Sequence, residues 1–178
     1  MPRLFVAIDL PEQVKASLSR LPLEVPGAKC VGAPEIHLTL RFIGEVDPEI
    51  SAAIKVALAG VCFETFTLSV QGVGHFPPHG HPRVLWVGLE QCVQLIRLQQ
   101  ELELALLQTG ICAEERRFSP HITLARLKET PSTAVARFES INRELAFPPF
   151  QVEEFILYSS TLTRHGAIHN KEATYGCK

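Results

Sequence analysis

Two stretches of this chain decide its fold: residues 36–44, which read IHLTLRFIG, and residues 121–127, which read HITLARL. Each is a short run rich in branched residues, typical of a β-strand with one buried face. The two stretches lie 84 residues apart, so that His37 and Thr39 correspond to His121 and Thr123. A four-residue echo of this kind occurs often by chance, and its weight depends on what surrounds it.

The surroundings of the two stretches repeat as well. The same shift places Glu45 on Glu129 and Phe66 on Phe150. It also places a predicted helix that begins near Pro48 on one that begins near residue 132. We therefore predict an internal duplication within one bilobal domain that spans residues 1–178, with pseudo-repeats at about 1–80 and 81–178. Such a duplication can bring the same strand from each half to one central cleft.

The hydrophobic pattern predicts secondary structure along the whole chain. Strands are predicted at residues 4–10, 36–43, 66–73, 84–89, 121–127 and 150–158. Helices are predicted at residues 11–21, from residue 48 onwards, and at 93–108 and 132–141. Loops are predicted at the proline-containing residues 22–34, at the turn-rich residues 76–82 and around residues 165–170.

Composition and charge restrict the class of protein. The 178 residues, 46% of them hydrophobic, can bury a substantial core. A net charge of −2 argues against a basic face that tracks a long nucleic acid, although it allows a grip on one end or one phosphate. No apolar run approaches the ~20 residues of a membrane span, and the apolar N-terminal stretch is too short for a signal peptide. We expect a cytoplasmic monomer that does not contact membranes.

The cysteines do not indicate a metal or redox site. There are five of them, widely spaced and without a CxxC pair. Neither a structural zinc site nor a redox dithiol is therefore predicted, and unpaired cysteines fit a reducing cytosol.

Strand alternation predicts which side chains of the two stretches face the cleft. Successive side chains of a strand point to opposite faces, so His37, Thr39 and Arg41 are predicted to share one face. On the second strand, His121 and Thr123 share a face. Arg126 lies five residues beyond His121, so strict alternation points it away from the cleft unless a bulge brings it back.

Two imidazoles that face one phosphate can act as an acid–base pair. Histidine titrates near pH ~6.5, so one ring can be neutral and remove a proton while the other is protonated and donates one. Each such transfer is worth about 10²–10⁴-fold in rate. Thr39 and Thr123 would donate hydrogen bonds to the non-bridging oxygens, and this scheme requires no metal or other cofactor. A single histidine on a strand is more often a plain surface or core residue; the two matched copies favour the functional interpretation.

Other candidate residues carry weaker signals. His75, His79 and His81 cluster in a Pro/Gly-rich turn and, with His121, suggest a zinc site, but without metal-site spacing a solvated loop is favoured. His165 and His169 are predicted to be exposed in a polar C-terminal loop that could border the cleft. A basic rim that meets a phosphate chain is the alternative to ordinary surface for Arg83, Arg116, Arg117 and Lys128.

These motifs resemble the two-histidine (HxTx) phosphoesterase superfamily, and more narrowly the RNA 2′,3′-cyclic phosphodiesterases, formerly named 2′-5′ RNA ligases. The resemblance runs essentially end to end. It is carried by the blocks RLFVAI at residues 3–8, HLTLRFIG at 37–44, PRVLWVG at 82–88, FSPHITLAR at 118–126 and LYSS at 157–160.

The resemblance implies an α+β fold of two lobes, each an antiparallel sheet with helices packed outside and a central cleft between them. It implies metal-independent hydrolysis of an RNA-terminal 2′,3′-cyclic phosphate to a 2′-phosphate, with 2′-5′ ligation of RNA as the reverse chemistry. By this likeness His37 is the proton donor to the leaving 3′ oxygen and His121 is the base that activates water. The arginine that follows the second motif in the family matches Arg126.

Two alternatives remain open at this point. The chain could act on small cyclic nucleotides or 2′-5′ oligoadenylates, which suit its near-neutral charge. It could also be a nucleotide- or RNA-binding module that uses the cleft without turnover. RNA 3′ ends or other nucleotide phosphodiesters are the expected partners in each case.

Overall fold

The computed structural model describes residues 3–164 and 166–178. The first part of the chain contains β1 (Arg3–Asp9), α1 (Glu12–Ser19), β2 (Ala28–Cys30), a 3-10 turn η1 (Ala33–Glu35), β3 (His37–Glu45), α2 (Pro48–Ala59), β4 (Phe66–Leu68) and β5 (Val70–Phe76). The second part contains β6 (Val84–Leu89), α3 (Val93–Leu107), β7 (Ile122–Leu127), α4 (Ser132–Ile141), β8 (Phe150–Val152), β9 (Glu154–Thr163) and β10 (Gly166–Gly176).

Most of the predicted elements are present, and the differences have physical reasons. The predicted strands at 66–73 and 150–158 each break after three residues, at Ser69 and Glu153, which are themselves 84 residues apart. Two strands were missed. β2 is only three residues long, and β10 is an edge strand with most of its side chains half-buried or exposed, so neither carries a clear alternation.

The main sheet is antiparallel, in the order β10-β9-β1-β3-β7-β6-β5, with β2 also paired to β7. The predicted α+β class is thereby confirmed. The two predicted antiparallel sheets are present, and the two halves of the main sheet are joined at β3 and β7 through the pair Leu38↔Ile122. The second sheet is the small ribbon of β4 and β8.

The two halves of the chain exchange strands. β9, from the second half, pairs with β1, and β5, from the first half, pairs with β6. Between them, β4 and β8 pair with Thr67 opposite Gln151, which are 84 residues apart, and the Gln151 amide donates to the Thr67 hydroxyl at 3.1 Å. This symmetric pairing supports the duplication, which stays a prediction. Each half of the main sheet therefore contains strands from both pseudo-repeats, which lie at about 1–80 and 81–178.

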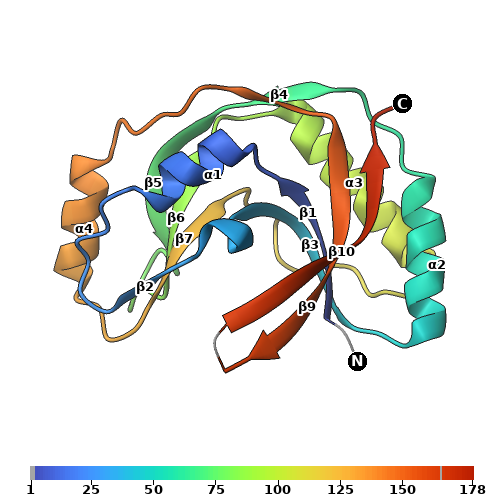
Figure 1. Cartoon of the computed structure of the whole chain (residues 1–178), viewed down its shortest axis with the longest axis horizontal. Helices are drawn as coiled ribbons and strands as arrows, with labels where there is room; N and C mark the ends of the chain where they lie inside the picture. Colours follow the sequence, from blue (N-terminus) through green and yellow to red (C-terminus); the bar gives the residue numbers. More distant parts are fainter. Residues whose placement is uncertain (1–2, 165) are drawn as a thin grey trace.

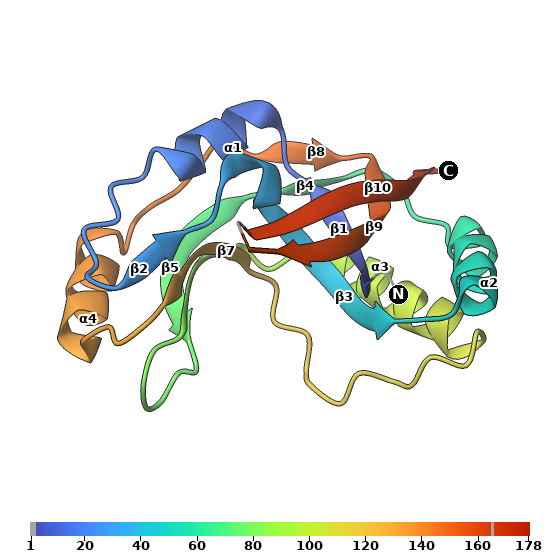
Figure 2. The ribbon, with the colours of Figure 1, turned by 60° about the horizontal axis from the view of Figure 1, so that its bottom comes forward.

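The helices lie around the strands. Figure 1 shows α4 at one end of the molecule, α2 at the other end with α3 beside it, and α1 between them, below β4. Figure 2, from another side, shows the long connection between α3 and β7 running along the open edge. The main core contains the apolar face of β1, including Leu4, Val6 and Ile8. Among the described residues, no helix has the length and hydrophobicity needed to cross a membrane.

Candidate active site

The two His-x-Thr motifs meet where the halves of the sheet join. Leu38 and Ile122 are fully buried and pair with each other in antiparallel orientation. Side chains at the neighbouring positions therefore point to the opposite face of the sheet. The register sets His37 across from Thr123 and Thr39 across from His121. The tertiary structure thus brings together four predicted site residues that are far apart in the sequence.

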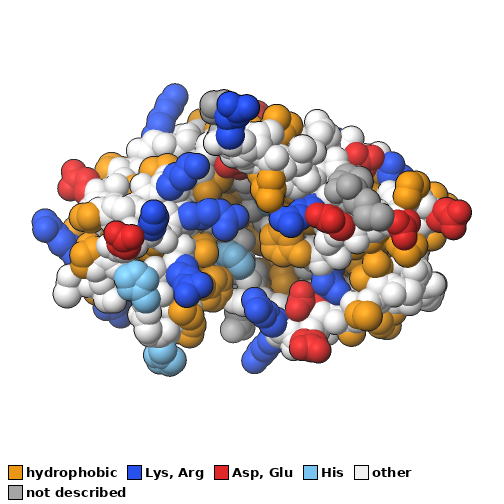
Figure 3. Space-filling model, turned by 90° about the horizontal axis from the view of Figure 1, so that it is seen from below, with side chains coloured by type: hydrophobic (Ala, Val, Ile, Leu, Met, Phe, Trp, Pro, Cys, Tyr) orange, Lys and Arg blue, Asp and Glu red, His pale blue; other side chains and the backbone are white. Residues whose placement is uncertain are grey.

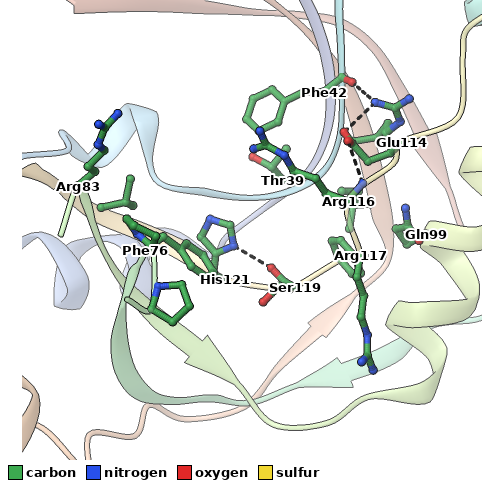
Figure 4. Close-up of a pocket in the computed structure, with 16 residues that line it drawn as sticks. Thr39, Phe42, Phe76, Arg83, Gln99, Glu114, Arg116, Arg117, Ser119 and His121 are labelled. Carbon is green, nitrogen blue, oxygen red and sulfur yellow. Dashed lines mark hydrogen bonds and ion pairs between the residues drawn. The ribbon is translucent and has the colours of Figure 1, made fainter. Parts of the chain in front are cut away.

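His121 is oriented by its own backbone. Its Nδ1–H donates to the carbonyl oxygen of Ser119 at 2.8 Å, which leaves Nε2 as the free ring nitrogen (Figure 4). The Phe76 ring meets the imidazole edge-to-face with centroids 4.9 Å apart, and the Trp86 ring lies 6.4 Å away. Trp86 in turn lies against Gly74, where any Cβ would collide with the indole ring. A glycine on β5 therefore makes room for the ring beneath His121.

His37 has the matching backbone contact but different neighbours. It hydrogen-bonds to the backbone of Glu35, two residues earlier, as His121 does to Ser119. The rings around it are Phe5 at 5.0 Å and His169 at 5.2 Å, the latter edge-to-face. Burial, and next the charge of His169, lower the pKa of His37 from 6.5 to about 4. In the free protein His37 is therefore neutral at neutral pH.

His169 lies beside His37, in agreement with the expectation that its segment could border the cleft. It was predicted to lie in an exposed loop, and this was wrong: it lies on β10, half-buried, opposite Ser160 of β9. Burial lowers its pKa as well. The repeat could not predict this contact, because β10 follows the last element shared by the two halves. His165, placed in the same predicted loop, lies outside the described residues.

A charged cluster lies behind His37. Asp9 is opposite His37 in the β1–β3 pairing and binds Lys15 at 2.5 Å and Lys171 at 3.1 Å. Burial alone would raise the pKa of Asp9, but hydrogen bonds from the two lysines hold it below its ordinary value. The Tyr158 hydroxyl also bonds to Asp9, and burial, followed by this carboxylate, raises the pKa of Tyr158. Asp9 thus remains ionised and compensated at neutral pH.

A β-bulge in each motif changes which later side chains face the cleft. Leu40 is the extra residue of β3 opposite β1, and Leu124 is the extra residue of β7 opposite β6. A bulge reverses the alternation beyond it. Arg126 is accordingly exposed on the face of Thr123, as the prediction allowed if a bulge was present. Phe42, at the equivalent position of β3, is 64% exposed.

The same bulge overturns the predicted orientation of Arg41. This side chain was expected on the face of His37, but it is only 8% exposed and points to the helical side. Its Nε pairs with Glu103 at 2.5 Å, its Nη1 with Glu114 at 3.2 Å, and its Nη2 donates to the Cys112 carbonyl at 2.6 Å. The guanidinium is thereby occupied by protein groups, which leaves it poorly placed to bind a phosphate.

A cavity of about 610 Å³ opens beside the two motifs. Thr39 and His121 are among the residues that line it, together with Phe42, Phe76, Arg83, Arg116, Arg117 and Phe118. Figure 4 shows Thr39 and His121 between Phe76 and Arg83 on one side and Phe42, Glu114 and Arg116 on the other. In the space-filling view, a hollow lies at the centre of this face with basic side chains around it (Figure 3).

The histidines of the predicted turn take another role. His75 lies on β5 and pairs through Nδ1 with Glu139 at 2.6 Å. His79 and His81 are exposed. Among residues 3–164 and 166–178, no three His, Cys, Asp or Glu side chains gather closely enough to hold a metal ion. The zinc arrangement considered for these histidines therefore does not form.

Comparison with known proteins identifies relatives along the whole chain. The model of the 2′-5′ RNA ligase superfamily matches residues 10–164. The RNA 2′,3′-cyclic phosphodiesterase of Thermotoga maritima is 36% identical over 184 residues, covering 99% of this chain and 95% of that protein. The protein of the same name from Archaeoglobus fulgidus is 35% identical over 173 residues, covering 94% of this chain and 96% of that protein.

Solved structures agree with these relatives. Escherichia coli LigT in complex with 3′-AMP is similar with a TM-score of 0.77 and 28% identity, and the match covers 100% of this chain and 99% of that one. A Thermus thermophilus protein, TT0787, is similar with a TM-score of 0.78 and 28% identity, covering 98% of this chain and 97% of that one.

Proposed function

Because the chain belongs to the 2′-5′ RNA ligase superfamily, we propose that it hydrolyses the 2′,3′-cyclic phosphate at the end of an RNA to a 2′-phosphate. The observation that carries the proposal is the register of β3 and β7, which sets each motif histidine across from the threonine of the other motif. Two imidazoles and two hydroxyls then occupy facing positions on neighbouring strands. Such an arrangement suits in-line displacement at one phosphorus atom.

The proposed reaction needs one base and one acid. Nε2 of His121, left free by the bond from Nδ1 to Ser119, takes a proton from water as the water oxygen bonds to phosphorus. The bond from phosphorus to the 3′ oxygen breaks, and His37 gives its proton to that oxygen. The family resemblance supplies these two roles, since the symmetric motifs alone do not separate them. If the 5′-hydroxyl of a second RNA attacks phosphorus in place of water, the same two proton transfers would break the bond to the 3′ oxygen and join the RNA ends through a 2′-5′ bond.

His37 must gain a proton before it can act as the acid. Its pKa of about 4 in the free protein leaves it neutral at neutral pH. A bound phosphodiester brings a negative charge close to the ring, and an opposite charge within ~4–6 Å favours the protonated form. We therefore expect substrate binding to be coupled to uptake of a proton.

The polar residues around the pair have separate proposed roles. Thr39 and Thr123 donate hydrogen bonds to the non-bridging oxygens, on which charge accumulates in the transition state. Arg126, exposed on the face of Thr123, is the cation proposed for the phosphate. Arg41 is given a supporting role instead, because its guanidinium is buried against Glu103 and Glu114.

The test is hydrolysis of an end-labelled RNA with a 2′,3′-cyclic phosphate in the presence of EDTA. Wild type is expected to form the 2′-phosphate, and His37→Ala and His121→Ala are expected to form none. His81→Ala, which changes an exposed histidine of the turn, is the matched control and should retain full activity. Absence of turnover by wild type, with RNA binding intact, would contradict the proposal and favour a binding module.

A further inference from the structure

We propose that the cavity beside the motifs is a groove for the RNA chain upstream of its last nucleotide, so that the protein prefers oligonucleotide ends to cyclic mononucleotides. This inference rests on the proposed function. The groove lies between Phe42 of β3 and residues 111–120, which we call the arginine loop. Thr39 and His121, where the terminal phosphate would lie, line it between Phe76 and Arg83 on one side and Glu114 and Arg116 on the other.

The groove is large enough for more than a phosphate. Its volume of about 610 Å³ lies within the range of roughly 300–1,000 Å³ that holds drug-sized ligands. A terminal cyclic phosphate needs only the part beside Thr39 and His121. The remaining length is open to the nucleotides that precede it.

The walls of the groove carry cations that have no protein partner. Arg83, Arg116 and Arg117 are exposed, and no acidic side chain in the described part of the chain pairs with theirs. Each can bind a backbone phosphate without losing an ion pair. Although the net charge of the chain is −2, positive charge is therefore concentrated locally at the place where an RNA backbone would enter.

Aromatic side chains accompany these cations. Phe42 is 64% exposed, although a phenylalanine gains free energy from burial. Phe76 and Phe118 line the same cavity and are half-buried. Exposed aromatic rings beside a positive groove form the usual platform for unpaired bases, which stack on the ring regardless of sequence. The occupant that fits is single-stranded RNA.

Arg41 holds the arginine loop in place. It bonds to the Cys112 carbonyl and pairs with Glu114 of that loop, while its Nε pairs with Glu103 of α3. Glu114 also accepts a hydrogen bond at 3.3 Å from the backbone N–H of Arg116. The loop backbone is therefore anchored to β3, while the side chains of Arg116 and Arg117 remain free. This gives Arg41 the role of a positioning residue.

The experiment compares a 2′,3′-cyclic mononucleotide with cyclic-ended oligonucleotides of two and four nucleotides. For wild type we expect kcat/KM to rise by about tenfold or more with length, because each stacked base and phosphate contact adds binding. In the double variant Arg116→Gln/Arg117→Gln, and separately in Phe42→Ala, most of this gain should be lost through a higher KM. Arg137→Gln/Arg143→Gln on and beside α4 is the charge-matched control and should keep the gain.

A binding measurement judges the groove independently of turnover. A labelled four-nucleotide RNA that ends in a 2′-phosphate should bind to wild type with strong salt dependence. The Arg116→Gln/Arg117→Gln variant should bind about tenfold more weakly, with a smaller salt slope. Equal kcat/KM for all lengths, or unchanged RNA affinity in this variant, would overturn the groove and leave the proposed function standing if the mononucleotide is still hydrolysed. Turnover of neither substrate by wild type would overturn the proposed function, and the binding result would still decide the groove.

Discussion

The surroundings of His37 and of His121 have the same local backbone geometry but different side chains. In both, a bulge falls on the leucine of the motif, and the backbone two residues before the histidine orients the ring. The ring that meets His121 edge-to-face is the apolar Phe76, whereas the ring that meets His37 edge-to-face is the titratable His169. Two residues past the bulge, the equivalent positions are Phe42 and Arg126.

This difference shows how a duplicated frame can serve two roles. The shared backbone fixes where each imidazole lies, which two facing groups on one phosphate require. The neighbours of His37 set how that ring holds its proton, because burial and the charge of His169 disfavour its protonated form. The differing neighbours also divide binding, since Arg126 suits a phosphate and Phe42 suits a base.

The largest expected effect separates the acid from the base. His37→Gln and His121→Gln should each lower kcat by about 10²–10⁴-fold. The base must be neutral, so the fall of kcat at low pH should disappear in His121→Gln. The acid must be protonated, so the fall at high pH should disappear in His37→Gln. Full pH profiles of kcat measure this, and the opposite assignment of the limbs would reverse the two roles.

A second change disturbs the packing around His121 and leaves the surroundings of His37 unchanged. In Gly74→Ala the new methyl group would collide with Trp86, which lies beneath the His121 ring. Overpacking of this kind costs about 1–3 kcal/mol, so the midpoint of urea unfolding should fall and kcat should fall with it. Gly176→Ala, where the nearest atom is 3.9 Å from the added Cβ, is the control. Unchanged stability in Gly74→Ala would show that Trp86 can move aside.

A third change tests the neighbour that distinguishes His37. Removing the charge of His169 in His169→Gln should raise the pKa of His37, because one of its causes of depression is lost while burial remains. Titration of the His37 ring signals by NMR measures the pKa directly. Any other neutral replacement of His169 should raise the pKa of His37 in the same way. A pKa that stays at its wild-type value would show that burial alone sets it.

The smallest expected effect is on stability. The pKa of His37 is about 4 when folded and 6.5 when unperturbed, so between these values the unfolded chain binds more protons. Protonation of His37 in the unfolded chain should therefore lower the free energy of unfolding progressively as pH falls from about 6.5 to about 4. Above about pH 6.5 the ring is neutral in both states, and His37 should have no such effect on stability. Urea unfolding at pH 7 and pH 5 should show a smaller loss in His37→Gln than in wild type. An identical loss would place the responsible group elsewhere.

The sequence by itself determined the two motifs, their strands and most of the helices. Period-2 alternation fixes the faces of His37 and Thr39, and of His121 and Thr123, because it depends only on the local backbone. The repeat of 84 residues then predicts that the pair acts together, and the family resemblance supplies the chemistry.

Only the tertiary structure decided what surrounds those motifs. A bulge depends on the register with a neighbouring strand, so no local pattern could show that Arg41 turns inward and Phe42 outward. The pairing of β9 with β10, which places His169 beside His37, likewise depends on a strand, β10, that has no counterpart in the repeat. Alternation is a property of one strand, whereas bulges, edges and exchanged strands are properties of pairs, and a single sequence pattern records only the first.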